Sequence, residues 1–207
     1  MSYCDWDNTS EINVRYHDTE WGVPLHDDKG QFEFLMLEVM QCGLNWNMMM
    51  QKRNIFRKCF ADFDFDKVAS YQEDDIQRIL GTEGMLRSRR KVEAVISNAK
   101  CFQDVRREFG TFSDYIWGFS NGKTILYKGH ADGWIPSSNG LSLLINQDLK
   151  RRGFKYVGAI TIYSHLQACG IINDHSRHCP RYAEINKSNP TTVKAPDKEV
   201  NTVFYGL

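Results

Sequence analysis

The sequence predicts an all-α protein. Apolar residues recur with the helical period over most of the chain, for example over residues 32–40, and this spacing places them on one face of a helix. Residues that favour helix N-caps precede several of these stretches, and glycines follow them. Strand patterns are scarce: only residues 118–127 fit one, as a small hairpin with Asn121-Gly122 at its turn.

Seven stretches combine the helical period with a capping residue, a terminating glycine or both. In chain order they run from Asp27 or Asp28 to Gly43, from Asn45 or Asn47 through Phe60, from Ser70 (a capping box with Glu73) through Leu80, from Ser88 through Ala99, from Thr111 or Ser113 through Trp117, from Ser137 or Ser138 to Gly153, and from Gly158 to Gly170.

Length and composition fit one folded domain. The chain has 207 residues and equal numbers of basic and acidic side chains, 26 of each, so any nucleic-acid footprint must be a local basic patch. The first residues lack a signal-peptide pattern, residues 156–172 are too short and too polar to span a bilayer, and the six cysteines are scattered. We therefore expect a cytoplasmic protein outside the membrane. Residues 1–179 are expected to form the domain, and residues 180–207 a polar, proline-containing tail in a loop or partly disordered.

Two Cys/His pairs near the chain ends suggest a metal site. Cys4 and His17 have twelve residues between them, and His175 and Cys179 have three. A Cys2His2 set suits tetrahedral zinc, and four protein ligands would close the coordination sphere, which makes the metal structural. The spacing equally allows four unrelated residues, and His178 could replace His175.

Aromatic residues and one carboxylate form a second candidate site. Trp6, Tyr16, Trp21 and Trp46 lie in the first quarter of the chain, and Glu38 interrupts an apolar helix face. A carboxylate there is costly without a partner, so Glu38 either pairs at the rim of the core or binds a ligand. Aromatic rings around a carboxylate favour a flat cationic ring.

Several of these residues belong to longer motifs. In order they are Tyr16-His17-Asp18-x-Glu20-Trp21-Gly22, Glu38, Gly43-Leu44-x-Trp46, Gly153-Phe154-Lys155-Tyr156-Val157-Gly158 and Asn173-Asp174-His175. With this order and spacing, from Cys4 to about Cys179, the chain resembles the 3-methyladenine DNA glycosylase I family.

The resemblance implies a helix-hairpin-helix glycosylase fold, in which two helical lobes flank a base pocket. It implies a monomer that binds duplex DNA with alkylated bases. It also implies one structural zinc, held by Cys4, His17, His175 and Cys179, that joins the two end segments. The implied pocket residues are Glu38, Tyr16, Trp46, Trp21 and Trp6, and the implied DNA-binding hairpin contains Gly84, Arg87, Arg89, Arg90 and Lys91. That hairpin also makes sense by itself, because a glycine turn before a helix N-terminus suits a phosphate.

The implied reaction flips the base out of the duplex and hydrolyses its bond to the sugar. A 3-methylated purine is cationic and leaves readily, so the expected role of Glu38 is charge selectivity. No lysine is evidently placed as a Schiff-base nucleophile, so we expect an abasic site and no strand cleavage.

The sequence departs from the family pattern at Asn45, where serine is usual, and at Asn13, where tyrosine is usual; Cys42 and the methionines 48–50 are also unusual. These departures concern the substrate range. They leave open a non-catalytic DNA-damage binding module on the same scaffold. A zinc-dependent hydrolase is the other alternative, and four closed ligands argue against it.

Overall fold

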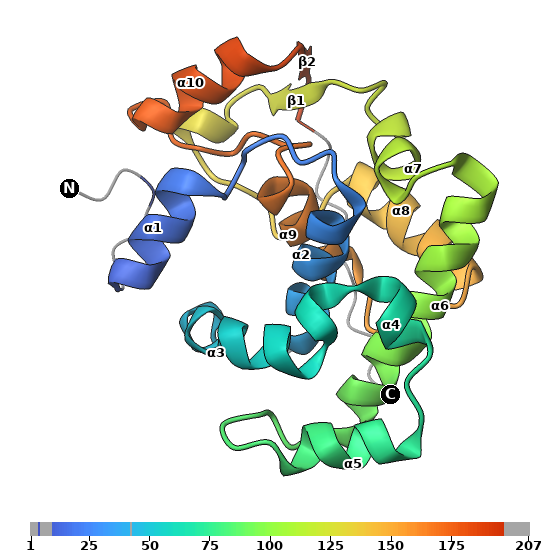
Figure 1. Cartoon of the computed structure of the whole chain (residues 1–207). Coiled ribbons are helices and arrows are strands. Elements are labelled where there is room, and N and C mark those ends of the chain that lie inside the picture. Colours follow the sequence, from blue (N-terminus) through green and yellow to red (C-terminus); the bar gives the residue numbers. More distant parts are fainter. Residues whose placement is uncertain (1–3, 5–9, 42, 197–207) are drawn as a thin grey trace.

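The structure, a computed structural model, describes residues 4, 10–41 and 43–196. These residues form a mostly helical molecule (Figure 1). The α-helices are α1 (Glu11–Thr19), α2 (Asp28–Gln41), α3 (Trp46–Cys59), α4 (Phe65–Ala69), α5 (Glu73–Gly81), α6 (Arg89–Phe109), α7 (Phe112–Gly118), α8 (Gly140–Arg151), α9 (Ala159–Ala168) and α10 (Pro180–Ser188). The short 3-10 helices are η2 (Ala61–Phe63) and η3 (His130–Asp132), and the strands are β1 (Thr124–Tyr127) and β2 (Thr191–Lys194).

Helix α2 is the central element of the fold. Every residue from Gln31 to Met40 is buried, because α3, α6 and α9 pack around the helix. Two carboxylates, Glu33 and Glu38, are carried into the interior in this way. A buried carboxylate needs a charged or hydrogen-bonding partner, so α2 both forms the core and positions polar chemistry inside it.

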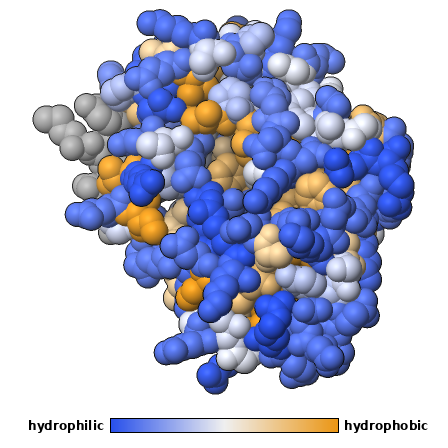
Figure 2. Space-filling model, in the orientation of Figure 1, coloured by the Kyte–Doolittle hydropathy of each residue, from blue (hydrophilic) through white to orange (hydrophobic). Residues whose placement is uncertain are grey.

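The seven expected helices are all present, and they correspond to α2, α3 and α5 to α9. Two N-caps differ from the expectation. The N-cap of α5 is Gln72, in a capping box with Asp75, and the N-cap of α8 is Asn139. None of the helices in the described ranges has the length and apolar content needed to cross a membrane. The exposed face of the molecule in Figure 2 is largely hydrophilic, with apolar side chains gathered mainly in its hollows.

The expected hairpin over residues 118–127 is wrong. Asn121 and Gly122 do form a turn with positive φ angles, but β1 pairs in parallel with β2, with Thr124 opposite Thr191. A single residue, Ile172, bridges the other side of β1 at Ile125. Sequence patterns read locally favour hairpins, whereas this pairing joins distant segments.

The expectation of a loop or disorder after Cys179 is also wrong for residues 180–194, which form α10 and β2. Pro180 occupies the first turn of α10, where proline costs no backbone hydrogen bond. Ile185 is buried, and the side chain of Asn173 donates to Asn186. Tertiary contacts thus order a segment of unremarkable composition; the tail beyond residue 196 lies outside the described residues.

Candidate functional site

A pocket of about 330 Å³ opens between α1, α2, α3 and α9. This volume lies within the usual range for a small-molecule site. Three aromatic, four polar and one aliphatic side chain line it. They are Tyr16, Trp21, Glu38, Gln41, Trp46, Ile135, Ser164 and Gln167. The structure therefore brings together the four expected pocket residues Tyr16, Trp21, Glu38 and Trp46; Trp6 lies outside the described residues.

Glu38 is the buried carboxyl of this pocket. Its exposed fraction is 6%, and burial raises its pKa from 4.5 to about 8. The charged form therefore lacks the hydration that it has in water. A cationic ligand in the pocket would supply the missing stabilisation, so the site favours a positively charged ring over a neutral one of the same shape.

Tyr16 and Trp46 form the aromatic side of the pocket. Their ring centroids lie 5.3 Å apart with a tilt of 50°, and the ring of Phe34 packs edge-on against Tyr16 at 6.0 Å. Burial and the negative charge of Glu38 raise the pKa of Tyr16 well above 10. Its phenol therefore remains a hydrogen-bond donor at neutral pH, and Trp46, the first residue of α3, offers a ring face for stacking.

Trp21 connects the pocket to the Cys/His cluster. Its ring packs edge-on against that of His175, with centroids 4.4 Å apart, and its backbone carbonyl lies 3.1 Å from Nε2 of His175. The next residue, Gly22, has φ +79°, and a Cβ there would lie 2.8 Å from Nε2 of His175. A glycine is thus required where the pocket wall meets the cluster.

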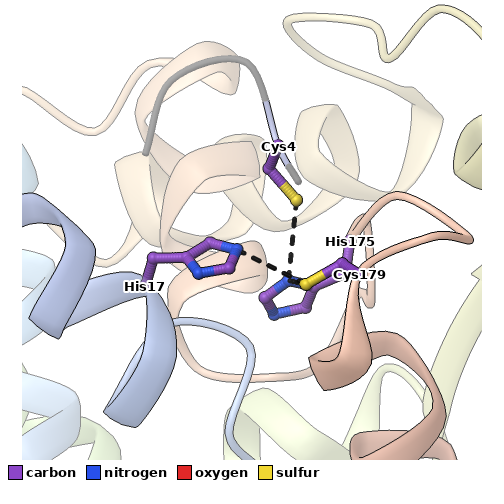
Figure 3. Close-up of side chains that lie close together, drawn as sticks. All are labelled: Cys4, His17, His175 and Cys179. Carbon is purple, nitrogen blue, oxygen red and sulfur yellow. Dashed lines mark hydrogen bonds between the residues drawn. The ribbon is translucent and has the colours of Figure 1, made fainter. Parts of the chain in front are cut away.

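The four expected metal ligands converge (Figure 3). One ligand atom from each of Cys4, His17, His175 and Cys179 lies within 4.8 Å of the other three, and all four residues are buried. Sγ of Cys179 lies 3.7 Å from Nε2 of His17 and 3.6 Å from Nδ1 of His175. Sγ of Cys4 lies 3.8 Å from the same Nδ1. His178 is exposed, so the alternative ligand set is excluded.

The donor set fits a tetrahedral zinc ion. Zinc bonds of about 2.3 Å to sulfur and 2.1 Å to nitrogen place S and N ligands about 3.6 Å apart, close to the separations in the cluster. The second ring nitrogen of each histidine faces an acceptor: Nδ1 of His17 lies 2.7 Å from Asp18, and Nε2 of His175 faces the carbonyl of Trp21. Such outer partners fix the tautomer that ligates a metal.

The expected DNA-binding segment is the turn between α5 and α6. It lies at the opposite end of the molecule from α10 and the β1–β2 pair (Figure 1). Gly84 makes the turn with φ +77°. Arg89 forms ion pairs with Glu73 and Glu93, and Lys91 donates to the carbonyl of Met40.

Two other cations of this segment, Arg87 and Arg90, are exposed. Neither has an ion pair within the described parts of the chain. Their charges are therefore available to a phosphate, whereas the charge of Arg89 is already partly neutralised.

One departure from the family pattern has a clear structural reading. Asn45 is the N-cap of α3, and its side chain accepts from the backbone N–H of Asn47 at 2.8 Å. Asparagine and serine cap helices about equally well, so Asn45 leaves the pocket intact. Asn13 is buried in α1, three residues before Tyr16, and Cys42 lies outside the described residues.

Four pocket residues were not expected from the sequence: Gln41, Ile135, Ser164 and Gln167. Ser164 and Gln167 lie three residues apart, so they share one face of α9. Their signal was present in the sequence, because they are polar residues within the otherwise apolar stretch 156–172. Ile135 comes from the loop before α8 and carries no such signal.

Comparison with known families assigns the chain. The family model described as methyladenine glycosylase matches residues 6–182. The chain belongs to the methyladenine glycosylase family. The match spans both halves of the Cys/His cluster except Cys4, and it includes all the pocket residues named above.

Curated relatives and solved structures of the methyladenine glycosylase family agree with this assignment. The chain is 39% identical over 182 residues to DNA-3-methyladenine glycosylase 1 of Escherichia coli, covering 88% of this chain and 97% of that protein. It is 36% identical to the Haemophilus influenzae DNA-3-methyladenine glycosylase, covering 86% and 96%. A crystal structure of 3-methyladenine DNA glycosylase I superposes with a TM-score of 0.81 at 39% identity, covering 86% and 98%. The Staphylococcus aureus enzyme, studied for 3-methyladenine recognition, gives 0.82 at 31%, covering 87% and 96%.

Proposed function

We propose that this chain is a monofunctional DNA glycosylase of base excision repair, which hydrolyses the N-glycosidic bond of 3-methyladenine in DNA and leaves an abasic site. One observation carries the proposal: the buried carboxyl of Glu38 lies in a pocket walled by aromatic rings. Relatives over 30% identical and covering most of the chain carry the name DNA-3-methyladenine glycosylase.

In the proposed reaction the main task of the enzyme is to recognise the methylated base, because this base leaves readily. Trp46 stacks on the flipped base, Glu38 and Tyr16 hydrogen-bond its edge, and Trp21 forms part of the wall. Trp6, which the family resemblance also assigns to the pocket, lies outside the described residues. A cationic base in the pocket favours the ionised form of Glu38, whereas normal adenine is neutral, so the resulting ion pair selects the methylated base. As the bond from C1′ to N9 breaks, the base departs with the bonding electrons, and a water oxygen bonds to C1′ and releases one proton to the solvent. No covalent enzyme intermediate is required.

The Cys/His cluster is proposed to hold one structural zinc ion through Cys4, His17, His175 and Cys179. Four protein ligands leave no position for a reacting water, so the ion would stabilise the fold only. Support comes from the S···N separations and from the acceptors on the outer ring nitrogens. Through Trp21, the same ion would steady one wall of the pocket.

DNA binding is assigned to the turn between α5 and α6, as the hairpin of a helix-hairpin-helix motif. The N-terminus of α6 offers free backbone N–H groups to a phosphate. Gly84 and Arg87 precede this end, and Arg89, Arg90 and Lys91 are its first three residues. The proposed domain comprises two helical lobes around the pocket, and it extends past residue 179 because β2 pairs with β1. The protein is proposed to act as a monomer in the cytoplasm, where the described free cysteines would stay reduced.

Release of free bases from methylated DNA, identified by mass, tests the proposed function. The expected product is 3-methyladenine, with abasic sites left in an uncleaved strand. Binding to methylated DNA without any base release would instead establish the non-catalytic binding module.

A further inference from the structure

One wall of the pocket is formed by polar side chains of α9 that have no role in the chemistry described so far. Ser164 and Gln167 both line the pocket from this helix. Gln167 is half-buried, and its amide nitrogen donates to Oδ2 of Asp174 at 2.9 Å. The side chain is therefore anchored at its nitrogen end.

Asp174 is a deeply buried anchor for that amide. Its exposed fraction is 1%. Besides Gln167 it accepts from the hydroxyl of Tyr163 at 2.6 Å, and Nδ1 of His130 lies 2.8 Å from Oδ1. The next backbone N–H along the chain, that of His175, bonds to the side chain of Asn173. The carboxylate is thus held by two side chains of α9 and by His130 of η3.

This arrangement decides which way the Gln167 amide faces. A carboxylate only accepts hydrogen bonds, so the NH2 group must turn toward Asp174. The carbonyl Oε1 then points away from Asp174, and the Gln167 side chain is one of those that line the pocket. Within the described residues Oε1 accepts no hydrogen bond. The hydrogen bond to Asp174 therefore fixes the orientation of the Gln167 amide and leaves its carbonyl oxygen as an acceptor.

We propose that Gln167 is a specificity-determining residue, whose carbonyl reads the 6-amino group of a purine in the pocket, and that Asp174 is the positioning residue that holds it. The proposal rests on the proposed function and assigns selectivity at position 6 of its base to these two further residues. An amino group has two N–H bonds to donate, one to Glu38 and one to Gln167. A 6-oxo purine would instead place an acceptor against the carbonyl.

Glu38 alone does not make this distinction. Burial raises its pKa to about 8, and a protonated carboxyl can donate to a 6-oxo group as readily as an ionised one accepts from a 6-amino group. The Gln167 carbonyl cannot donate in either case. Discrimination at position 6 therefore falls to the amide that Asp174 orients.

Two free bases that differ in the group at position 6, and in the ring proton that accompanies it, test the proposed role of Gln167. Binding of 3-methyladenine and of 3-methylhypoxanthine is measured by calorimetry for the wild type and for Gln167→Met, which keeps the length of the side chain but has no carbonyl. We expect the ratio of the two affinities to fall about tenfold, or about 1.4 kcal/mol. An unchanged ratio, or equal weakening of both bases, would overturn the proposal.

The Asp174→Asn variant provides a second test, in which the affinity for one of the two bases is expected to increase. An asparagine amide at position 174 can donate to Oε1, which turns the NH2 group of Gln167 toward the pocket, so affinity for 3-methylhypoxanthine should rise. Tyr163→Phe is the matched control, because it removes a donor to the same carboxylate but leaves the amide in place; its ratio should equal that of the wild type. Metal content is measured in every variant, since Asp174 adjoins His175.

Base release by the wild type separates this inference from the proposed function. Wild-type protein that binds 3-methyladenine selectively but releases none from methylated DNA contradicts the glycosylase proposal alone. If the wild type releases 3-methyladenine but Gln167→Met keeps the wild-type affinity ratio, only the proposed role of Gln167 is contradicted. Wild-type protein that binds neither base contradicts both.

Discussion

Arg53 of α3 and Glu33 of α2 form an ion pair in which Nε and Oε1 lie 2.7 Å apart. Each side chain is only 11% exposed. The same guanidinium also contacts Glu20, just after α1, at 2.7 Å. One cation therefore joins the three helices that carry Tyr16, Glu38 and Trp46, and the shape of the pocket depends on a residue that does not line it.

Replacing Arg53 with methionine should lower the free energy of unfolding by about 2 kcal/mol, because the poorly exposed Glu33 then keeps only Arg57 as a partner and Glu20 loses its contact with Arg53. Urea unfolding measures this. Arg107→Met is the control, because its ion pair with Asp104 is largely exposed and should contribute less than about 1 kcal/mol. Equal losses in both variants would show that Arg53 has no special role.

Pure protein should contain one zinc ion per chain, and removal of the ion should lower the melting temperature sharply, because structural metal binding is folding free energy. Cys179→Ser should lose both the zinc and the response to chelator. Cys101→Ser, a partly buried cysteine outside the cluster, should keep both. Metal analysis of each protein checks this, and a wild type without zinc would exclude the site.

Replacing Arg87 and Arg90 together with alanine should weaken binding to every duplex alike. The slope of log affinity against log salt should fall by about 2, since each phosphate contact contributes about 0.9. Arg89→Ala should reduce the slope less, because Glu73 and Glu93 already hold that charge. If the double variant keeps the wild-type slope, the turn between α5 and α6 does not bind DNA.

The pKa of Glu38 makes stability depend on pH. The folded protein keeps a proton up to about pH 8, whereas the unfolded chain loses it near pH 4.5. The stability that this carboxyl contributes is therefore full below pH 4.5 and is lost as pH rises to 8, by at most roughly 5 kcal/mol. Glu38→Gln should remove this loss, so the variant should melt above the wild type at pH 9. Thermal scans from pH 5 to pH 9 test the sign.

The same variant should release 3-methyladenine roughly 10- to 100-fold more slowly, because a charge-assisted hydrogen bond to the cationic base is lost. It should keep its zinc. Its preference for 3-methyladenine over adenine should also shrink. Single-turnover release at wild-type rates would remove Glu38 from the proposed mechanism.

The sequence predicts the helices whose own pattern specifies them. Helices α3 and α6 have an apolar period and clear ends, and both form as expected. Helix α2 also forms, but its buried residues surround the helix and do not follow one face. Helix α1 was not foreseen, because its buried residues Asn13 and His17 are polar and blur the pattern. Helix α10 depends on tertiary contacts such as those of Ile185, which the local sequence does not encode.

The residues of the candidate site can also be separated into those that the local sequence reveals and those that only the tertiary structure reveals. Glu38 could be identified because a carboxylate among apolar neighbours stands out in a sequence. The roles of Gln167 and Asp174 could not be seen together, because only the return of the chain after α9 brings the two side chains within hydrogen-bonding distance. Likewise, the ion pairs that occupy Arg89 become visible only when α5 lies beside α6.

The Cys/His cluster has a consequence for the kinetics of folding. Its contacts join residues 171 positions apart in the case of Cys4 and His175, and 162 in the case of His17 and Cys179. Contacts between such distant residues form late, after the local helices, because closing a long loop costs conformational entropy. Interactions absent from the folding transition state act on the unfolding rate. An ion bound there would leave the refolding rate nearly unchanged and would slow unfolding, so it would contribute to kinetic stability and not to the speed of folding.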